Sequence, residues 1–151
     1  MSRAFVKETA ERAVPPERMV ASGPNLVTEE GLAKIASEVE RLEKALAAET
    51  NVLLRETLER DLRYWRQSKA SAQMVPRPVA GSAIAFGSTV TFSRNGGKPQ
   101  TIRIVGEDEA DPKAGLINFR SPLAQALIGA EVGDTMEMVS PRAELTVSNV
   151  E

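Results

Sequence analysis

Residues 102–129 read "IRIVGEDEADPKAGLINFRSPLAQALIG". The β-branched run "IRIV" and the later "LINF" each predict a strand, and the acidic "GEDEAD" between them predicts a loop. "SPLAQALIG" predicts a short helix, because Ser121 can cap it, Pro122 suits its first turn and Gly129 suits its end. Strand, loop, strand and helix in so short a run of residues indicate a compact α+β domain.

Further strand signals flank this region on both sides. They are "AIAF", "STVTF", "TMEMV" and "ELTVSNV", all rich in apolar or β-branched residues. "SRNGGKP" contains Asn95-Gly96 and predicts a hairpin turn. Pro76 and Gly81 end the helical pattern that precedes them. We therefore expect residues 76–151 to form an antiparallel β-sheet domain with one short helix.

Residues 28–75 carry two heptad series of apolar residues. The first predicts a helix that Thr28 caps and that packs through one narrow stripe. Its members are Leu32, Ile35, Val39, Leu42 and Leu46. The second series consists of Leu54, Leu58, Leu62, Trp65, Lys69, Ala72 and Val75. Because the break between the two helices is short, they must fold back on each other, and we expect an antiparallel coiled-coil hairpin.

The predicted tip of this hairpin is Glu49, Thr50 and Asn51. Either Thr50 or Asn51 is expected to cap the second helix. Before the hairpin, residues 1–27 contain several prolines and show no sustained periodicity. We interpret them as an extended or disordered arm.

The composition excludes several classes of site. The 151 residues include no cysteine and no histidine, so disulfides, thiolate or imidazole metal ligands and Ser-His or Cys-His nucleophiles are excluded. A metal would need carboxylate ligands alone, which suit Mg²⁺ or Ca²⁺. No apolar run approaches the ~20 residues of a membrane span, and the N-terminal sequence lacks the apolar stretch of a signal peptide. We therefore expect a cytoplasmic protein.

The charge pattern argues against nucleic-acid binding. The net charge is −2, so we expect no stable direct contact with DNA. A locally basic stretch in the second predicted helix is interleaved with acidic residues, which favours a salt-bridged helix surface over a nucleic-acid patch. Its basic residues are Arg55, Arg60, Arg63, Arg66 and Lys69.

The acidic loop places four carboxylates in residues 107–111 and contains the letters Asp-Glu-Ala-Asp of helicases. The phosphate-binding loop that should accompany them is missing, because Gly97-Lys98 is followed by Pro99 and lacks the other glycine of that motif. An EF-hand is excluded as well, since alternating oxygen ligands are absent. From the residues alone, the loop is best interpreted as a solvated connection between strands.

Several phrases resemble, in the same order and spacing, the C-terminal domain of the bacterial GreA/GreB transcript cleavage factors. They are "FGSTVTF", "IRIVGEDEAD", "GLINFRSPLAQALIG" and "EVGD". "VTEEGLAKIASEVERL" resembles the start of the helical hairpin in the same family. The resemblance covers residues 26–151 and implies an FKBP-like C-terminal domain. That domain docks on the rim of the secondary channel of RNA polymerase, and the hairpin enters the channel.

In that family an acidic pair at the hairpin tip helps to hold a Mg²⁺ ion of the polymerase, which then hydrolyses its own backtracked RNA. This tip motif is absent here, where "ALAAETNVLLRE" offers Glu49 alone. The hairpin is also about twenty residues shorter, which removes ~15 Å of reach. In its shortened hairpin the chain resembles the regulator of nucleoside diphosphate kinase family, a polymerase-binding family without cleavage activity.

The resemblance implies a monomeric, non-enzymatic regulator of RNA polymerase, with no catalytic residues, no metal and no cofactor of its own. Candidate partner-binding residues lie in the acidic loop and around the short helix. They are Asp108, Glu109, Asp111, Arg120, Ser121, Pro122 and Gln125. Two alternatives stay open: a cleavage factor that acts through Glu49, and a prolyl isomerase or chaperone, which the FKBP-like fold alone suggests.

Overall fold

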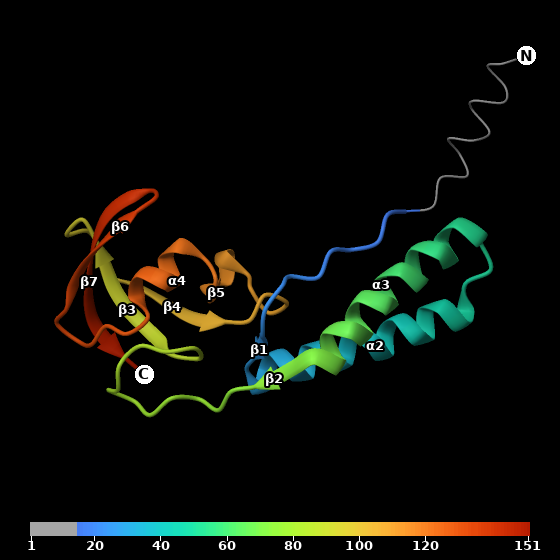
Figure 1. Ribbon diagram of the computed structural model, residues 1–151, viewed down its shortest axis with the longest axis horizontal. Coiled ribbons are helices and arrows are strands. Elements are labelled where there is room, and N and C mark those ends of the chain that lie inside the picture. The colour runs from blue at the N-terminus through green and yellow to red at the C-terminus, as the bar shows by residue number, and fades with distance from the viewer. Residues whose placement is uncertain (1–14) are drawn as a thin grey trace, which may run out of the picture. The chain divides into compact units, whose positions relative to one another are not determined.

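The computed structural model describes residues 15–151, and the chain divides into two compact units. Residues 15–23 and 35–71 belong to one unit, and residues 24–34 and 72–151 form the other. The domain boundaries expected at residues 27/28 and 75/76 stay predictions. The predicted α+β class, a helical hairpin followed by a sheet domain, is confirmed (Figure 1).

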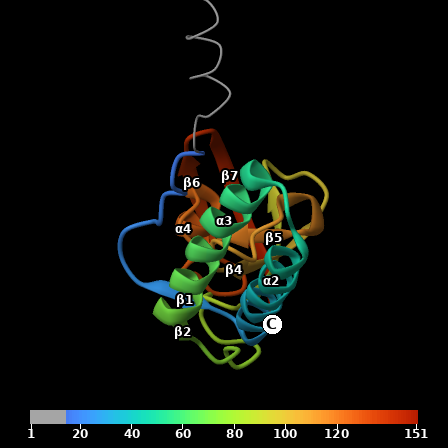
Figure 2. The same cartoon turned by 90° about the vertical axis from the view of Figure 1, so that its right-hand side faces the viewer.

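Helices α2 (Glu29–Ala48) and α3 (Val52–Ser71) form the hairpin and lie side by side in both views (Figure 1 and Figure 2). The apolar contact between them consists of buried Val39, Leu42 and Leu62 with partly buried Leu46, Leu58 and Trp65. Heptad spacing thus identified the contact correctly. Within residues 15–151, no helix has the length and apolar character that a membrane span requires.

The second heptad series is wrong at both ends. Leu54 is exposed near the tip, and Ser68 is buried where the series assigned Lys69 to the contact. The strict heptad count therefore fails at Lys69, which is exposed. Helix α3 also ends at Ser71, which leaves Ala72 outside it.

Residues 15–23, the described part of the predicted arm before β1, contact α3. Arg63 donates hydrogen bonds to the Glu17 carboxylate. The Arg18 guanidinium lies 3.9 Å from the centroid of the Tyr64 ring and 3.6 Å from the Asp61 carboxylate. The hydrogen bond from Arg63 lowers the pKa of Glu17 below its ordinary value. Residues 1–14 of the predicted arm lie outside the described residues.

The last residues of the arm, which we expected to be extended or disordered, form a strand. Strand β1 (Asn25–Val27) pairs in parallel with β2 (Ala72–Met74). The Val75 N–H continues the pairing by donating to the Val27 carbonyl at 2.9 Å. The chain entering α2 and the chain leaving α3 are thereby joined by backbone hydrogen bonds.

The C-terminal sheet has five strands in the order β5–β4–β3–β7–β6. These are β3 (Thr89–Arg94), β4 (Gln100–Val105), β5 (Leu116–Asn118), β6 (Thr135–Val139) and β7 (Arg142–Val150). Strands β4 and β5 are parallel and the other pairs are antiparallel, so the expectation of a purely antiparallel sheet is wrong at this edge. The intervening loop and the 3₁₀ turn η1 (Pro112–Ala114) return the chain to the start of β4 before β5 begins.

The predicted turn between β3 and β4 is confirmed, while "AIAF" is not a strand. Asn95 and Gly96 have φ angles of 52° and 70°, as a type I′ hairpin turn requires. Ile84 and Phe86 of "AIAF" are buried in the domain core. The backbone of Ile84 exchanges hydrogen bonds with Gly129 and Ala130 (2.7 and 2.8 Å). The apolar character of "AIAF" therefore reflects burial and not strand pairing.

Helix α4 (Pro122–Leu127) packs on the sheet as predicted. The Ala124 N–H donates to Ser121 Oγ at 3.2 Å, which confirms Ser121 as the N-cap. Leu127 is fully buried in the domain core, and Leu123 packs partly against it. This packing fixes Ser121 and Pro122 at the start of the helix, beside β5.

The hairpin contact makes a testable prediction. Leu42 is 1% exposed, so Leu42→Ala is expected to lower the free energy of unfolding of the hairpin by about 2–4 kcal/mol. Leu54→Ala is the matched control, because Leu54 is 54% exposed and its loss is expected to cost less than about 0.5 kcal/mol. Denaturant titration followed by the fluorescence of Trp65, the only tryptophan, measures both. Equal effects of the two variants would contradict the observed pairing.

Candidate functional site

Glu109 turns inward from the acidic loop. Its side chain is 8% exposed, and its Oε1 accepts a hydrogen bond from Thr28 Oγ. Thr28 is itself buried and caps α2, because its Oγ accepts a hydrogen bond from the Gly31 N–H at 2.9 Å. The carboxylate thus completes the cap at a helix N-terminus, where negative charge is favourable. This burial corrects the expectation that Glu109 contacts a partner, since its carboxylate is enclosed by its own chain.

Two glycines allow the backbone to approach closely around this hydrogen bond. A Cβ atom on Gly31 would lie 2.7 Å from Glu109 Oε1. A Cβ atom on Gly106 would collide with the Leu26 carbonyl oxygen of β1. The acidic loop, β1 and the first turn of α2 are therefore packed against each other with no room for a side chain at either position.

An ion pair reinforces the same contact. Arg103 of β4, whose side chain is 13% exposed, lies 3.2 Å from the Glu30 carboxylate in the first turn of α2. A hydrogen bond from its own backbone N–H and the nearby Arg103 guanidinium hold the pKa of Glu30 below its ordinary value. The start of α2 is thus held by one buried hydrogen bond and one partly buried ion pair.

The other predicted residues of the acidic loop and of the segment after it lie nearer the surface. Asp108 is half-buried and Asp111 is exposed. The Arg120 guanidinium donates to the Pro24 carbonyl oxygen at 2.9 Å, so part of its hydrogen-bonding capacity is used within the chain. The Gln125 side-chain amide donates to the Phe119 carbonyl oxygen at 2.6 Å. Arg120 and Gln125 therefore also stabilise the loop that leads into α4.

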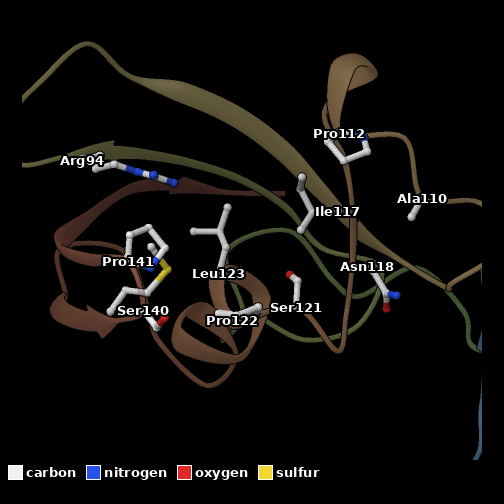
Figure 3. Close-up of a pocket in the computed structure, with 11 residues that line it drawn as sticks. Arg94, Ala110, Pro112, Ile117, Asn118, Ser121, Pro122, Leu123, Ser140 and Pro141 are labelled. Carbon is white, nitrogen blue, oxygen red and sulfur yellow. The ribbon is translucent and has the colours of Figure 1, made fainter.

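A cavity of about 280 Å³ lies beside α4 (Figure 3). It is lined by the end of the acidic loop, β5, the start of α4, β6 and the β6–β7 turn. The lining residues are Arg94, Ala110, Pro112, Ile117, Asn118, Ser121, Pro122, Leu123, Met138, Ser140 and Pro141. Most of this lining is apolar, so the cavity suits an apolar group of a ligand or partner.

Two of the predicted partner-binding residues line the cavity, and the others do not. Ser121 and Pro122 line it, whereas Asp108, Glu109 and Gln125 do not. Sequence reasoning missed Arg94, Met138 and the β6–β7 turn, which reach the cavity from separate strands. Their positions in the sequence do not indicate that they lie close together, because the pairing of strands in the sheet brings them to the same cavity.

The hairpin tip, Glu49 to Asn51, uses its polar groups within the chain. Glu49 Oε1 accepts hydrogen bonds from the Thr50 and Asn51 N–H groups at 3.1 and 2.9 Å. Asn51 caps α3 by accepting from the Leu54 N–H at 3.1 Å. Arg55 donates to the carbonyl oxygens of Leu46 and Glu49 at 2.8 and 2.7 Å, and thereby closes the end of α2.

The surface beside the tip is apolar. Val52, Leu53 and Leu54 in the first turn of α3 are 67%, 49% and 54% exposed. In the part of the chain that the structure describes, no group of three or more acidic side chains is arranged to hold a metal ion. The tip therefore presents one engaged carboxylate next to exposed apolar side chains.

Several basic residues of α3 are paired with acidic ones, as the sequence pattern favoured. Arg60 lies 2.9 Å from Asp61, and Arg66 lies 3.3 Å from Glu43 across the hairpin. Arg63 contacts Glu17, as described above. This face of α3 is a salt-bridged helix surface, and exposed pairs of this kind contribute little to stability.

The sheet domain matches a known family. The family described as "Transcription elongation factor, GreA/GreB, C-term" matches residues 79–151. The C-terminal domain belongs to the GreA/GreB family. Among curated relatives, transcription elongation factor GreA of Sphingopyxis alaskensis is 45% identical over 74 residues, which are 48% of this chain and 47% of the relative. GreA of Polaromonas naphthalenivorans is 46% identical over 79 residues, half of each chain.

The chain thus spans about half the length of the curated GreA relatives it matches. Solved structures were also compared with the whole chain. GreA factor homolog 1 of Thermus thermophilus is 19% identical, with a TM-score of 0.42 and coverage of 85% of this chain and 99% of that protein. A GreA/GreB elongation factor of Nitrosomonas europaea is 20% identical, with a TM-score of 0.41 and coverage of 85% and 98%.

The buried contact of Glu109 makes a second testable prediction. Glu109→Ala is expected to lower the free energy of unfolding by about 1–3 kcal/mol, because the buried Thr28 hydroxyl loses its acceptor. Thermal unfolding followed by circular dichroism measures this change. Hydrogen exchange at the Gly31 and Leu32 amides should accelerate as the first turn of α2 opens.

The control for this experiment is Glu107→Ala, in the same loop. Glu107 is exposed, so its replacement is expected to change stability by less than about 0.5 kcal/mol. If Glu109→Ala behaves like this control, the carboxylate does not hold the start of α2.

Proposed function

We propose that this chain regulates transcription by binding RNA polymerase through its GreA/GreB C-terminal domain, without stimulating transcript cleavage. The family match over residues 79–151 and the names of its curated relatives, transcription elongation factors, support the first part. The resemblance in sequence implies docking at the rim of the secondary channel. The proposal that the chain does not stimulate cleavage rests on the hairpin tip, where the Glu49 carboxylate is already hydrogen-bonded within the chain.

The cavity beside α4 is the proposed docking surface. Ser121 and Pro122, which the sequence resemblance indicated as polymerase contacts, both line it. Its apolar walls would bury an apolar side chain of the polymerase, and such burial is the main favourable term in most protein association. Helix α4 and the sheet hold these walls rigidly, because Ala124 and Leu127 are fully buried beneath them.

The chemistry of the tip argues against a role in cleavage. Stabilising a second Mg²⁺ in the polymerase requires carboxylate oxygens with free lone pairs, because Mg²⁺ binds oxygen ligands in a strict octahedron. Glu49 offers one carboxylate, and one of its oxygens accepts two backbone N–H groups. The neighbouring residues Val52, Leu53 and Leu54 cannot supply a second ligand.

The length of the hairpin supports the same conclusion. Each helix has 20 residues and is therefore ~30 Å long. The resemblance implies arms about ten residues longer in cleavage factors, or ~15 Å of additional reach. Catalytic ligands must be placed to within a fraction of an ångström, so a shortfall of this size is not compensated by side-chain motion.

The isomerase alternative receives no support from the cavity. An isomerase pocket is expected to have an aromatic lining, and no aromatic residue is among those that line the cavity. Phe92 is fully buried in the core, while Phe86 and Phe119 contact each other edge to face with ring centroids 5.4 Å apart. We therefore do not assign prolyl isomerase activity to this domain.

Binding to the polymerase gives a third testable prediction. The full chain is expected to be retained by immobilised core RNA polymerase at low salt. Pro122→Glu is expected to weaken this binding about tenfold or more, because it places a charge at the apolar cavity while glutamate is tolerated in the first turn of a helix. Val132→Glu is the matched control, at an exposed apolar residue that does not line the cavity. Failure of the unmodified chain to bind would reject the proposed function.

Cleavage gives a fourth testable prediction. The chain is expected to leave RNA in backtracked elongation complexes at the length produced by the polymerase alone, and to compete with a GreA relative that shortens it. Gel analysis of nascent RNA with and without the chain measures both effects. Mg²⁺-dependent shortening that disappears in Glu49→Ala would show instead that the short hairpin delivers a ligand, and the chain would then be a cleavage factor.

A further inference from the structure

The described part of the N-terminal arm follows α3 in the direction of the hairpin tip. Strand β1 pairs Asn25 with Ala72, directly after the end of α3. Earlier in the chain, the Arg18 guanidinium lies over the Tyr64 ring and 3.6 Å from the Asp61 carboxylate (Figure 1). From residue 25 back to residue 18, the contact thus moves along α3 towards its first turn. The chain that precedes Arg18 is therefore led towards the tip.

The first turn of α3 exposes two apolar side chains on the side of the helix that the arm contacts. Leu53 and Leu54 are 49% and 54% exposed. Leu54 lies two turns before Asp61, and Leu53 lies three turns before Tyr64, so each pair shares one side of an α-helix with 3.6 residues per turn. At a rise of 1.5 Å per residue, the two leucines lie ~11–17 Å beyond the contact of the arm. The path of the arm along α3 thus continues onto apolar surface.

The segment before Pro15 can supply an apolar partner for this surface. Residues 1–14 include the adjacent apolar residues Phe5 and Val6. An extended chain spans up to ~33 Å between Phe5 and Pro15, which exceeds the distance required. A segment tethered this closely has an effective concentration on the order of millimolar. A second copy of the chain or a free partner must compete with that concentration, which favours the chain's own segment as the occupant.

We propose that residues 1–14 fold back on the hairpin tip and cover Leu53 and Leu54. Phe5 and Val6 supply the apolar contact, and the burial of both surfaces from water is its driving force. A partner that binds this side of the tip must first displace the segment, so residues 1–14 control access to the tip. The inference concerns the chain alone and does not depend on the proposed function.

The test exploits the lack of cysteine in the chain. Leu54→Cys in the full chain introduces a single thiol at the proposed contact, and its rate of reaction with an uncharged maleimide measures how often it is uncovered. Phe5→Ser and Val6→Ser, combined in this background, form the double serine variant. It is expected to react at least about threefold faster, because the thiol is no longer protected by a closed state. Both rates refer to the same cysteine, so the intrinsic reactivity of the thiol is equal.

Two controls accompany this measurement. Lys7→Ser combined with Glu8→Ser changes the neighbouring residues without altering the net charge, and it should leave the rate at Leu54→Cys within about 1.5-fold. Val52→Cys places the thiol at a 67% exposed position, ~160° around the helix from Leu54. Its rate should not respond to the double serine variant, because the proposed contact does not reach that side.

The outcomes distinguish the proposed cover from its alternatives. Acceleration at Leu54→Cys alone, at a rate independent of protein concentration, supports the inference. An unchanged rate in the double serine variant would show that the leucines are not covered and would reject it. Equal acceleration at Val52→Cys would indicate general loosening of the tip and would also reject it. Protection that increases with protein concentration would identify a second copy of the chain as the occupant, and the inference would again be rejected.

Discussion

The hydrogen bond between Thr28 Oγ and Glu109 is the constraint on which the start of the hairpin depends. It joins residues 81 positions apart in the sequence and is buried, so neither group can turn to water without opening the structure. Close packing at Gly31 and Gly106 leaves no alternative position for the acidic loop. Strand β1, which pairs in parallel with β2, leads the chain into α2 beside this loop. An acidic cluster that suggests metal binding thus supplies a helix cap.

Local signals in the sequence predicted most of the fold. The Asn95-Gly96 turn and the Ser121 cap each depend on residues within a few positions of one another, and the contact of Leu42 follows from a heptad spacing within each helix. The errors arose where distant segments decide the outcome. "AIAF" packs against the core without joining the sheet, and β5 runs parallel to β4 because the loop between them is long enough to cross back. Lys69, which the heptad count placed in the helix contact, is exposed, while the neighbouring Ser68 is buried.

The candidate site was predictable only in part, for a similar reason. Ser121 and Pro122 carry a recognisable motif and line the cavity. Arg94 and Met138 reach the same cavity from β3 and β6, and no pattern in their own neighbourhoods indicates it. Glu109 and Asp111 look equivalent in the sequence, yet one is buried and the other exposed. Which carboxylate faces inward depends on where the Thr28 hydroxyl lies, and that is set by tertiary structure.

The hairpin tip and the cavity beside α4 offer a partner different surfaces. At the tip, Glu49, Asn51 and Arg55 are hydrogen-bonded to the backbone, and the exposed side chains Val52, Leu53 and Leu54 beside them are apolar. Such a tip suits contact with an apolar surface and not the delivery of an ion. The cavity beside α4 instead has mostly apolar walls, to which Ile117, Leu123 and Met138 contribute. Apolar walls of this kind can bury an apolar group of a partner, and we therefore propose that recognition involves the C-terminal domain.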